Sequence, residues 1–543
     1  MNRKSLKILS LILAMLMLLG IGAPVVRAEE AEGTKDIVNI AVTNTVNTLN
    51  PFLYDGTIVN TYAIGLQYLP MVELNADMTF QGLIAEEITT EDNLTFTIKI
   101  NPDAKWSDGE DITSDDVIFT LLNLTSVGMG NLNTYIYASF EGFNEGGQLE
   151  DNTPLEDVPS IERVDEKTLK LTAMAPIPLN TFMSSYMRYL NPVPKHVFEG
   201  KSIEEMKTTD YFNKAEVVSG PYRAVEASLD QYVSYEAVEN YWRGTPKIKS
   251  LNIKVLEGSA ILAGLQSGEV DFVQPTMATV PVEDMEAIEN LEGISTVYDK
   301  PLTNNLLFMN MESIPELEVR QAIQYAIDRP MLMENFINGK GEVTDGFVTS
   351  FSPYYDDSLE IAEFDAEKAK ELVEASGFDK ELKFIVNSGD PIFMNAVNVV
   401  VQQLKDVGIN TKVQSMDIGS LLEAVNNHEY DLMAVQYTFA PIDPLLDIAW
   451  LAGSADGAVN WSQYASEEMN ELLAAASEVK DGDTEGMIKA LGDIDRLVQK
   501  DLPVISLYVQ TPLGAVRENL ENAVPSAYGF FNNVQEWSFG DAE

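Results

Sequence analysis

"ELKFIVNSGDPIFMNAVNVVVQQLKDVGINTKVQS" (residues 381–415) contains two short strand-like runs separated by a longer, helix-like segment. The segment from Pro391 to Val407 has the length of a helix, and the next residue, Gly408, is of a type that commonly ends helices. After another helix, "DLMAVQY" (431–437) predicts a third strand. This alternation predicts an α/β fold with a mostly parallel sheet covered by helices.

Three more helices are marked between residues 319 and 377. The first is predicted from an apolar face with helical spacing, formed by Val319, Ala322, Ile323, Ala326 and Ile327. We expect Arg320 of this helix at the surface. Pro330 suits the first turn of a second helix that closes at Gly339, and Asp365 can cap a third.

Further strands are predicted in the first half of the chain. They are "IVNIAV" (37–42), "LTFTIKI" (94–100), "SLNIKVL" (250–256) and "VDFVQP" (270–275). A helix-like segment that stops at Gly268 separates the last two. No internal repeat is visible.

The stretch "WSDGEDITSDDVIFTLLNL" (106–124) combines a tryptophan with five acids and invites comparison with an active site. The position of each residue in the stretch favours a structural role instead. Gly109 suits a turn, Thr113 can cap the helix that follows, and Asp115 and Asp116 fall in the first helical turn, where the helix dipole favours negative charge. We expect Trp106 to pack at the end of the preceding strand, and the whole stretch to be structural.

Length and charge narrow the classes of function. A chain of 543 residues is expected to form two or three domains, and 45% hydrophobic residues provide for real cores. The net charge of −50 comes from 35 Lys and Arg against 85 Asp and Glu. Such a surface repels phosphate groups, so nucleic acid and anionic lipid are poor partners.

The N-terminus predicts export. Residues 1–28 have a basic start, an apolar core and a small-residue pattern ending at Ala28, which together indicate a signal peptide; an uncleaved anchor is the alternative. Residues 29–36 form an acidic spacer. The chain has no cysteine, so it has no disulfide and no cysteine to carry a lipid. We expect a periplasmic or extracellular, cell-surface-associated protein.

Signs of catalysis are few. The two histidines, His196 and His428, lie in separate segments without metal-ligand spacing, and no nucleophile elbow, phosphate-binding loop or dinucleotide fingerprint is present. Pairs of carboxylates are expected by chance among 85 acids. We therefore predict no catalytic residue, no metal site and no cofactor.

Five motifs in order resemble one family. They are "GLIAEEITTEDNLTFTIKINPDAKWSDGEDITSDDVIFTLLNL", "SGPYRAVEASLDQYVSYEAVENYWRGTPKIKSLNIKVL", "LQSGEVDFV", "VRQAIQYAIDR" and "FDAEKAKELVEASGF". Over roughly residues 37–540, the chain resembles the extracellular solute-binding proteins of the oligopeptide and dipeptide ABC transporter family, solute-binding protein family 5.

The resemblance implies a periplasmic-binding-protein-like fold of the cluster C type. Two α/β lobes are joined by a two-strand hinge, and an extra third domain is attached to one of them. Carried onto this chain, the first lobe comprises 37–75, 205–298 and 510–543. The extra domain comprises 76–204 and the second lobe 299–509.

The resemblance also implies a monomeric receptor, and not an enzyme, that captures an oligopeptide or similar amphipathic solute between closing lobes and delivers it to ABC permease subunits. An oligosaccharide is an alternative ligand, since related members bind sugars, nickel or haem. Nickel is disfavoured because two scattered histidines supply no evident site. From another class, a secreted carbohydrate-active hydrolase remains an alternative, and product formation by the purified protein would distinguish it.

Ligand contacts are predicted from one segment of the second lobe. Peptide binders of the family hold the peptide ammonium with an Asp four residues before the Pro of "D-x-x-[DE]-P"; here that position is Ala440, and the acid before Pro444 is Asp443. A peptide amine can still pair with Asp443 or Asp447. The predicted ligand-binding residues are Tyr437, Phe439, Asp443, Trp450 and Trp461, which cluster in sequence, and Tyr222 near the hinge.

Overall fold

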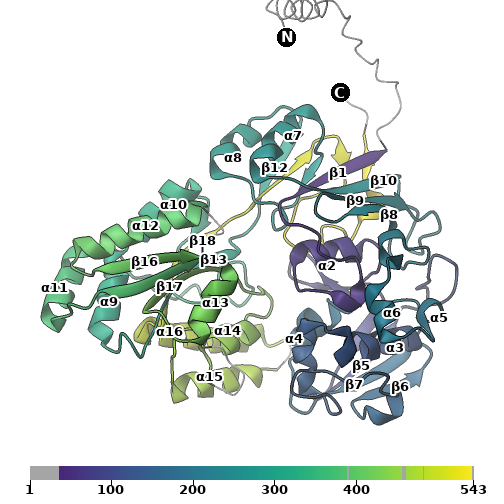
Figure 1. The fold of residues 1–543 in the computed structure, drawn as a ribbon, viewed down its shortest axis with the longest axis horizontal. Helices are drawn as coiled ribbons and strands as arrows, with labels where there is room; N and C mark the ends of the chain where they lie inside the picture. Colours follow the sequence, from purple (N-terminus) through teal and green to yellow (C-terminus); the bar gives the residue numbers. More distant parts are fainter. Residues whose placement is uncertain (1–35, 388–390, 455–459, 481, 541–543) are drawn as a thin grey trace, which may run out of the picture. The chain divides into compact units, whose positions relative to one another are not determined.

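The computed structural model describes residues 36–387, 391–454, 460–480 and 482–540 (Figure 1). The predicted signal peptide (1–28) and all but the last residue of the spacer (29–36) lie outside the described residues. In the described part, each helix is too short or too polar to cross a membrane. Within these described ranges the strands form three larger sheets, of seven, six and four strands, and two two-stranded ribbons.

The seven-stranded sheet joins distant segments of the chain, in the order β12-β19-β11-β1-β10-β9-β8. Its strands are β1 (Ile37–Val42), β8 (Tyr222–Ser228), β9 (Tyr232–Ala237), β10 (Ser250–Val255), β11 (Phe272–Val273), β12 (Ile294–Tyr298) and β19 (Leu513–Arg517). The central strand β1 pairs in parallel with β10 and β11, so the three strands predicted here are confirmed. Helices α2 (Ile58–Gly65), α7 (Ile261–Ser267) and α8 (Val282–Glu289) belong to the same region.

The six-stranded sheet has the order β14-β18-β13-β17-β15-β16. Its strands are β13 (Thr303–Met309), β14 (Gly341–Glu342), β15 (Leu382–Asn387), β16 (Thr411–Met416), β17 (Leu432–Thr438) and β18 (Val504–Gln510). Only the predicted strand–helix run is parallel, since β15 pairs in parallel with β16 and β17. The prediction of a mostly parallel sheet is wrong, because β13, β14 and β18 pair antiparallel.

Helices of this half surround the six-stranded sheet (Figure 1). They are α9 (Leu317–Ala326), α10 (Arg329–Ile337), α11 (Ala366–Ser376), α12 (Pro391–Asp406), α13 (Ile418–Asn426), α14 (Leu445–Ala452), α15 (Glu467–Ser477) and α16 (Thr484–Asp501). Pro330 lies in the first turn of α10 and the Asp365 side chain caps α11, as predicted. The surface position expected for Arg320 is wrong: its guanidinium is buried and donates to the carbonyl oxygens of Asp501 and Ile314.

The four-stranded sheet is antiparallel, with the order β4-β5-β7-β6. Its strands are β4 (Ala85–Thr89), β5 (Thr95–Ile100), β6 (Ile161–Asp165) and β7 (Thr168–Thr172), and α3 (Ser114–Leu124) packs beside it. Thr113 and Asp116 form a capping box at the start of α3, while Gly109 has a φ of 97° in the turn before it. Trp106 is buried, as expected for a side chain that packs at the end of a strand.

Short elements complete the region around the four-stranded sheet. They include α4 (Leu179–Thr181), α5 (Lys195–Phe198), α6 (Ile203–Thr208), the 3₁₀ segments η1 (Pro51–Leu53), η2 (Val127–Met129), η3 (Leu132–Ser139), η4 (Leu155–Asp157) and η6 (Tyr211–Lys214), and the ribbon of β2 (Val72–Leu74) with β3 (Phe80–Gly82). Segment η5 (Phe182–Met187) is a π-helix, a rare form that occurs frequently at functional sites. Elsewhere lie the 3₁₀ segments η7 (Gly258–Ala260) and η8 (Val534–Glu536) and the ribbon of β20 (Leu520–Glu521) with β21 (Ser538–Phe539).

The chain passes between the two largest sheets twice. It leaves the seven-stranded sheet at the end of β12 and enters β13, and it returns from β18 into β19. The two connections are residues 299–302 and 511–512. They lie together, because β12 pairs with β19 on one side and Thr303 pairs with Gln510 on the other.

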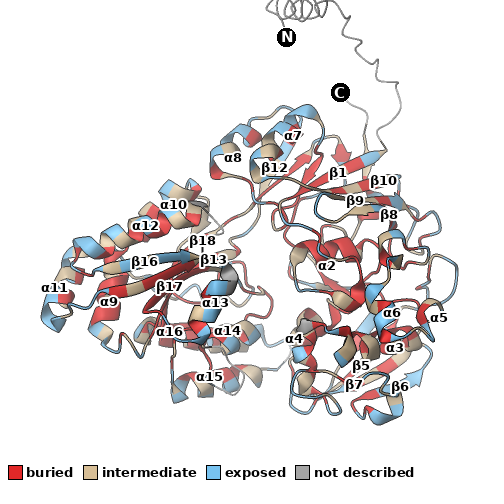
Figure 2. Ribbon diagram, viewed as in Figure 1, coloured by how far each residue is buried: buried red, intermediate tan, exposed pale blue. Residues whose placement is uncertain are grey.

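Buried residues concentrate in the strands and in the helix faces turned towards them (Figure 2). One large core joins the seven-stranded and four-stranded sheets and includes Val38 and Phe96. Two further cores use opposite faces of the six-stranded sheet: Leu307 belongs to one, and its neighbours Leu306 and Phe308 to the other. This alternation is what a strand buried on both faces requires.

Candidate functional site

A cavity of about 420 Å³, here named the first cavity, is bounded by segments from distant parts of the chain. Residues 51–58, 124–137, 184–189 and 438–447 all contribute to its wall, together with Leu74 and Tyr528. Such a volume falls within the range of small-molecule sites. The 438–447 segment, which follows β17, is the one that the sequence singled out.

Two carboxyl groups of this segment face the first cavity. Asp443 is only 7% exposed, and its Oδ2 atom has no hydrogen-bond partner among the described residues. Asp447, one helical turn further along, accepts hydrogen bonds from the hydroxyl of Tyr437 at 2.9 Å and from the backbone N–H of Ala440 at 3.3 Å. The backbone at Ala440 thus orients Asp447, although its side chain cannot bind an ammonium group.

The electrostatics of the pair follow from burial. The pKa of Asp443 is raised to about 6, chiefly by burial and in smaller part by the charge of Asp447, while the hydroxyl groups of Thr181 and Ser184 act in the opposite direction. Burial also raises the pKa of Asp447, against the hydrogen bond from Tyr437. Because desolvation disfavours the charged form, this wall gains from a positive charge placed beside it.

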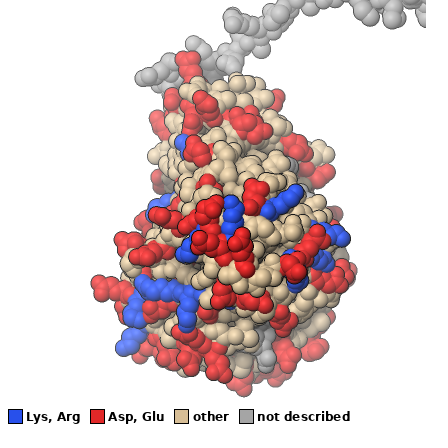
Figure 3. All heavy atoms as spheres, turned by 90° about the vertical axis from the view of Figure 1, so that its left-hand side faces the viewer, with Lys and Arg blue, Asp and Glu red and all other residues tan. Residues whose placement is uncertain are grey.

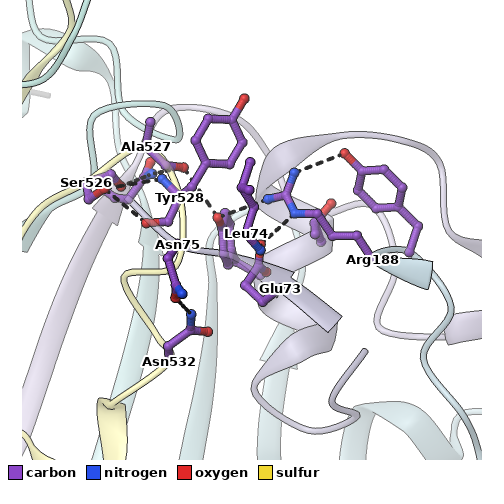
Figure 4. A network of polar contacts seen from close by, with 12 residues as sticks. Glu73, Leu74, Asn75, Arg188, Ser526, Ala527, Tyr528 and Asn532 are labelled. Carbon is purple, nitrogen blue, oxygen red and sulfur yellow. Dashed lines mark hydrogen bonds and ion pairs between the residues drawn. The ribbon is translucent and has the colours of Figure 1, made fainter. Parts of the chain in front are cut away.

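Another part of the wall carries a positive charge that is already neutralised. Arg188 follows the π-helix η5; its Nε donates to Glu73 Oε1 at 2.5 Å and its Nη2 to the Tyr62 hydroxyl at 3.3 Å. The guanidinium carbon also lies 4.8 Å from the ring centroid of Tyr528. Figure 4 shows Arg188 pointing towards Glu73, with Tyr528 beside them. We call the group formed by these four residues and Tyr189 the Arg188 network.

Neighbouring contacts anchor the C-terminal segment to the same network. The carbonyl of Ala527 accepts a hydrogen bond from the Tyr62 hydroxyl at 3.3 Å, and Asn532 donates to Asn75 Oδ1 at 2.6 Å (Figure 4). Gln274 donates to the carbonyl of Ser526 at 2.9 Å. The position of Tyr528 at the cavity wall is therefore fixed from both sides.

Aromatic rings line much of the remaining wall. Tyr54 and Tyr189 stack with ring centroids 5.1 Å apart. Tyr135 is 59% exposed and Leu446 43%, although both are large and belong to the cavity wall. Exposed apolar groups at a cavity are available to cover a ligand.

The structure separates the six predicted ligand-binding residues. Phe439 and Asp443 line the first cavity. Tyr437 supports Asp447 from behind, and its ring contacts Trp461, which is buried in a core and packs against the half-exposed Trp450. These three do not belong to the described cavity wall.

Tyr222, the sixth predicted residue, lies at the start of β8 and is completely buried. Its hydroxyl donates to the carbonyl of Ile248 at 3.0 Å. The side chain presents no surface to a ligand in this conformation, so we leave Tyr222 out of the proposed contacts below.

The sequence did not lead us to the other half of the site. Arg188, Tyr54 and Tyr135 come from segments without strong periodicity, and Glu73 belongs to a three-residue strand. One signal was available: Arg188 stands in an apolar and aromatic run, "FMSSYMRYL" (182–190), where an unpaired charge is costly. A charge in that setting indicates a buried partner.

A second cavity, of about 240 Å³, adjoins the first. The two share Ile58, Thr438 and Tyr528, which we call the neck. The wall of the second cavity also includes Leu302, Thr303, Gln510 and Pro512, which lie in or next to the two connections between the large sheets, and Thr276, Ala278, Thr279 and Val280.

Outside the cavities the surface is strongly acidic. Figure 3 shows Asp and Glu side chains over much of one face, with Lys and Arg interspersed. Among the described residues, no group of three or more His, Cys, Asp or Glu is arranged to hold a metal ion. His196 pairs with Asp108 at 2.8 Å, which ties it to the turn before α3.

Comparison with known proteins gives a consistent result. The model for bacterial extracellular solute-binding proteins, family 5 (middle), matches residues 79–458. The chain is 24% identical over 514 residues to the oligopeptide-binding protein AppA of Bacillus subtilis, covering 90% of this chain and 89% of AppA. It is also 24% identical over 529 residues to the glutathione-binding protein GsiB of Escherichia coli K12, covering 93% and 94%.

Solved structures share the fold. The ABC transporter substrate-binding protein CtaP from Listeria monocytogenes matches with a TM-score of 0.77 and 21% sequence identity, over 94% of this chain and 100% of that chain. At this identity the likeness shows the fold alone. The predicted α/β class is thus confirmed by both the sheets and the match.

Proposed function

Because the chain belongs to the bacterial extracellular solute-binding proteins, family 5, we propose that it captures an oligopeptide in the first cavity and delivers it to the permease subunits of an ABC importer. The family consists of binding proteins, and the chain is not an enzyme. Among its relatives, AppA is named an oligopeptide-binding protein and GsiB a glutathione-binding protein, so peptides are the ligand class with the most support.

The observation that carries this proposal is the composition of the first cavity. Its wall combines aromatic rings, a buried carboxylate oxygen without a partner at Asp443, and backbone of the 438–447 segment. An extended peptide offers complementary groups for each: apolar side chains, a positive charge and main-chain hydrogen bonds. The proposed direct contacts are Phe439, Asp443 and Asp447, with Tyr437 acting as a positioning residue for Asp447.

Capture works through differential binding to two conformations. The two connections, residues 299–302 and 511–512, are the proposed hinge between a first lobe (37–75, 205–298 and 510–543) and a second lobe (299–509). The extra domain (76–204) supplies Arg188 and Tyr135 to the cavity wall. A solute that contacts all three parts only when the lobes close shifts the population towards the closed form. The permease then recognises that form.

Export is part of the same proposal. We infer that residues 1–28 are removed after Ala28 and that the mature protein works outside the cytoplasm. N-terminal sequencing of the protein recovered from the cell exterior should read Glu29 first. Recovery only as an uncleaved cytoplasmic chain contradicts this part.

The test of function is ligand binding by the purified mature chain. Thermal unfolding is measured with di- to hexapeptides, with α- and β-linked oligosaccharides and with nickel chelates. We expect saturable stabilisation by peptides, of about 2.7 kcal/mol at a concentration 100 times the dissociation constant, without any product. If only oligosaccharides stabilise the protein, the ligand class is a sugar and not a peptide. Release of a product overturns the proposal.

A further inference from the structure

The first cavity has an excess of negative charge that its own residues do not balance. In the described part of the chain, no Lys, Arg or His side chain forms a hydrogen bond or ion pair with Asp443 or Asp447. The cation in the wall of the first cavity, Arg188, is engaged by Glu73 and by tyrosines. A buried carboxylate oxygen without a partner is costly, and such an oxygen at a cavity wall indicates a missing positive ligand.

The second cavity has the opposite character. Among the described residues that form its wall, the phenol of Tyr528 is the only ionisable side chain. It is made of apolar groups such as Met285 and Leu302 and of neutral polar groups such as Gln436 and Gln510. A charged group would lose its hydration there without gaining a counter-charge, so this cavity suits an uncharged segment.

The neck makes the two cavities neighbouring parts of one site. Ile58, Thr438 and Tyr528 belong to both walls, so a chain-like ligand in the first cavity can continue into the second. On the basis of the proposed function, we propose that the solute is a peptide with a positively charged group at one end and an uncharged segment at the other. The ammonium or guanidinium group lies against Asp443 and Asp447, and the uncharged segment passes the neck into the second cavity.

The second cavity also gives the ligand a route to the hinge. Leu302 and Thr303 belong to one connection region, and Gln510 and Pro512 to the other. An occupant touches both connections and therefore interacts differently with any two hinge conformations. A ligand that fills only the first cavity lacks these contacts. The site accordingly selects for length as well as for charge.

The positive group can come from either of two sources, the α-ammonium of the peptide or a lysine or arginine side chain. Both meet the same two carboxylates, and the position of the usual ammonium anchor, Ala440, does not distinguish them. Peptides with acetylated N-termini and amidated C-termini separate the sources, because their only charge is on a side chain.

The first experiment measures charge preference by calorimetric titration. Four blocked hexapeptides are compared: a neutral one, one with a single lysine at an end, one with the lysine in the middle, and one with a glutamate at the end. We expect the end-lysine peptide to bind at least about tenfold more tightly than the neutral one, the size of a charge-assisted hydrogen bond. The neutral hexapeptide is also measured with a free N-terminus. Equal affinity for the blocked lysine and glutamate peptides, together with no gain from the free N-terminus, overturns the proposal. A preference restricted to unblocked N-termini assigns the charge to the α-ammonium.

Variants identify the wall responsible. Asp443→Asn and Asp447→Asn should each abolish most of the lysine preference while leaving binding of the neutral peptide detectable. The matched control is Asp379→Asn, an exposed aspartate next to α11 that lines neither cavity. Should one variant fail to fold, by circular dichroism, the other still tests the proposal. If a folded double variant with both substitutions still prefers the lysine peptide, the proposal is contradicted.

The second cavity is tested by filling it. Thr279 is exposed and belongs to its wall, so Thr279→Trp adds bulk there. We expect this variant to lose about tenfold or more in affinity for the end-lysine hexapeptide and nothing for a blocked lysine dipeptide, which is too short to pass the neck. Thr172→Trp, at an exposed position of β7 outside both cavities, is the control.

Failure of this inference is distinguishable from failure of the proposed function. If no peptide of any charge or length binds, the proposed function fails. If peptides bind with no dependence on charge, or if Thr279→Trp affects the dipeptide and the hexapeptide equally, the function stands and the two-ended ligand is wrong.

Discussion

The two walls of the first cavity hold buried charges in opposite states. Arg188 has a carboxylate partner at 2.5 Å and tyrosine rings around it, whereas Asp443 has an oxygen with no partner at all in the described structure. A paired buried charge keeps the fold together, and removing its partner is strongly destabilising. An unpaired one destabilises the fold and is retained where a ligand supplies the missing partner. The completeness of the hydrogen bonding thus distinguishes a structural charge from the charge that we propose binds the ligand.

The Arg188 network is expected to give the largest effect. Glu73→Ala leaves the buried guanidinium without its carboxylate, which should lower the free energy of unfolding by about 3–5 kcal/mol. Urea denaturation followed by circular dichroism measures this change. A loss below about 1 kcal/mol would mean that the tyrosines alone stabilise Arg188, and the comparison between the walls would lose its basis.

Replacing Asp443 should stabilise the protein, in contrast to replacing Glu73. Its pKa is about 6 in the folded protein, above the ordinary value of 3.8, so the folded state binds the proton more tightly and stability falls as the pH rises from about 4 to 6. Asp443→Asn removes this loss. Without ligand, the variant should exceed the parent by roughly 1–3 kcal/mol at pH 8 and by much less at pH 4, about 1.4 kcal/mol for each pKa unit.

Thermal unfolding of both proteins at the two pH values checks this prediction. Asp495, whose pKa burial raises to about 7, contributes a pH dependence of the same sign to both proteins and cancels in the difference. A variant that is less stable than the parent at pH 8 would place Asp443 among the structural charges.

A neutral hydrogen bond near Asp443 should have a smaller effect. Asn180 Nδ2 donates to the Tyr354 hydroxyl at 2.8 Å, joining α4 to the loop before α11. In a double-mutant cycle, Asn180→Ala and Tyr354→Phe should show a coupling of about 0.5–1.5 kcal/mol in the free energy of unfolding. A coupling as large as that of the Arg188 network would show that net charge is not what distinguishes the walls.

The smallest effect is expected from a pair with the same charges at the surface. Lys99 contacts Glu87 at 2.6 Å, but about half of each side chain is exposed. Because solvent screens such pairs, Lys99→Ala should leave the midpoint of urea denaturation unchanged within error. A resolvable loss would mean that short distance, and not burial, determines the contribution of an ion pair in this chain.

Local patterns predicted much of the fold. The strands near 381–437, the cap at Thr113, the cap at Asp365 and the buried face of α9 follow from periodicity and from capping chemistry, which depend on residues close in sequence. The direction in which strands pair does not follow from such local patterns. The antiparallel pairing of β13 with β17 and β18 depends on where the chain crosses between sheets, and residues more than 100 apart decide it.

The candidate site also combines residues that could be predicted from one segment with residues that could not. Asp443 and Phe439 were found because the resemblance to the family pointed to the one short segment before Pro444. Tyr135, Arg188 and Tyr528 come to the cavity from three other segments, and no local pattern connects them. Trp461 was selected for its residue type, but tertiary packing places it in a core. The boundaries of the three domains stay a prediction.

The pairing of Thr303 with Gln510 has a consequence for how such proteins diversify. Everything between these two residues leaves the rest of the chain and returns to it at one place. Two crossovers at that place would exchange the entire six-stranded sheet between relatives, carrying Asp443 and Asp447 with it and leaving the Arg188 network behind. The charge that we propose selects the ligand and the paired charge of the Arg188 network thus lie on separable pieces of the gene.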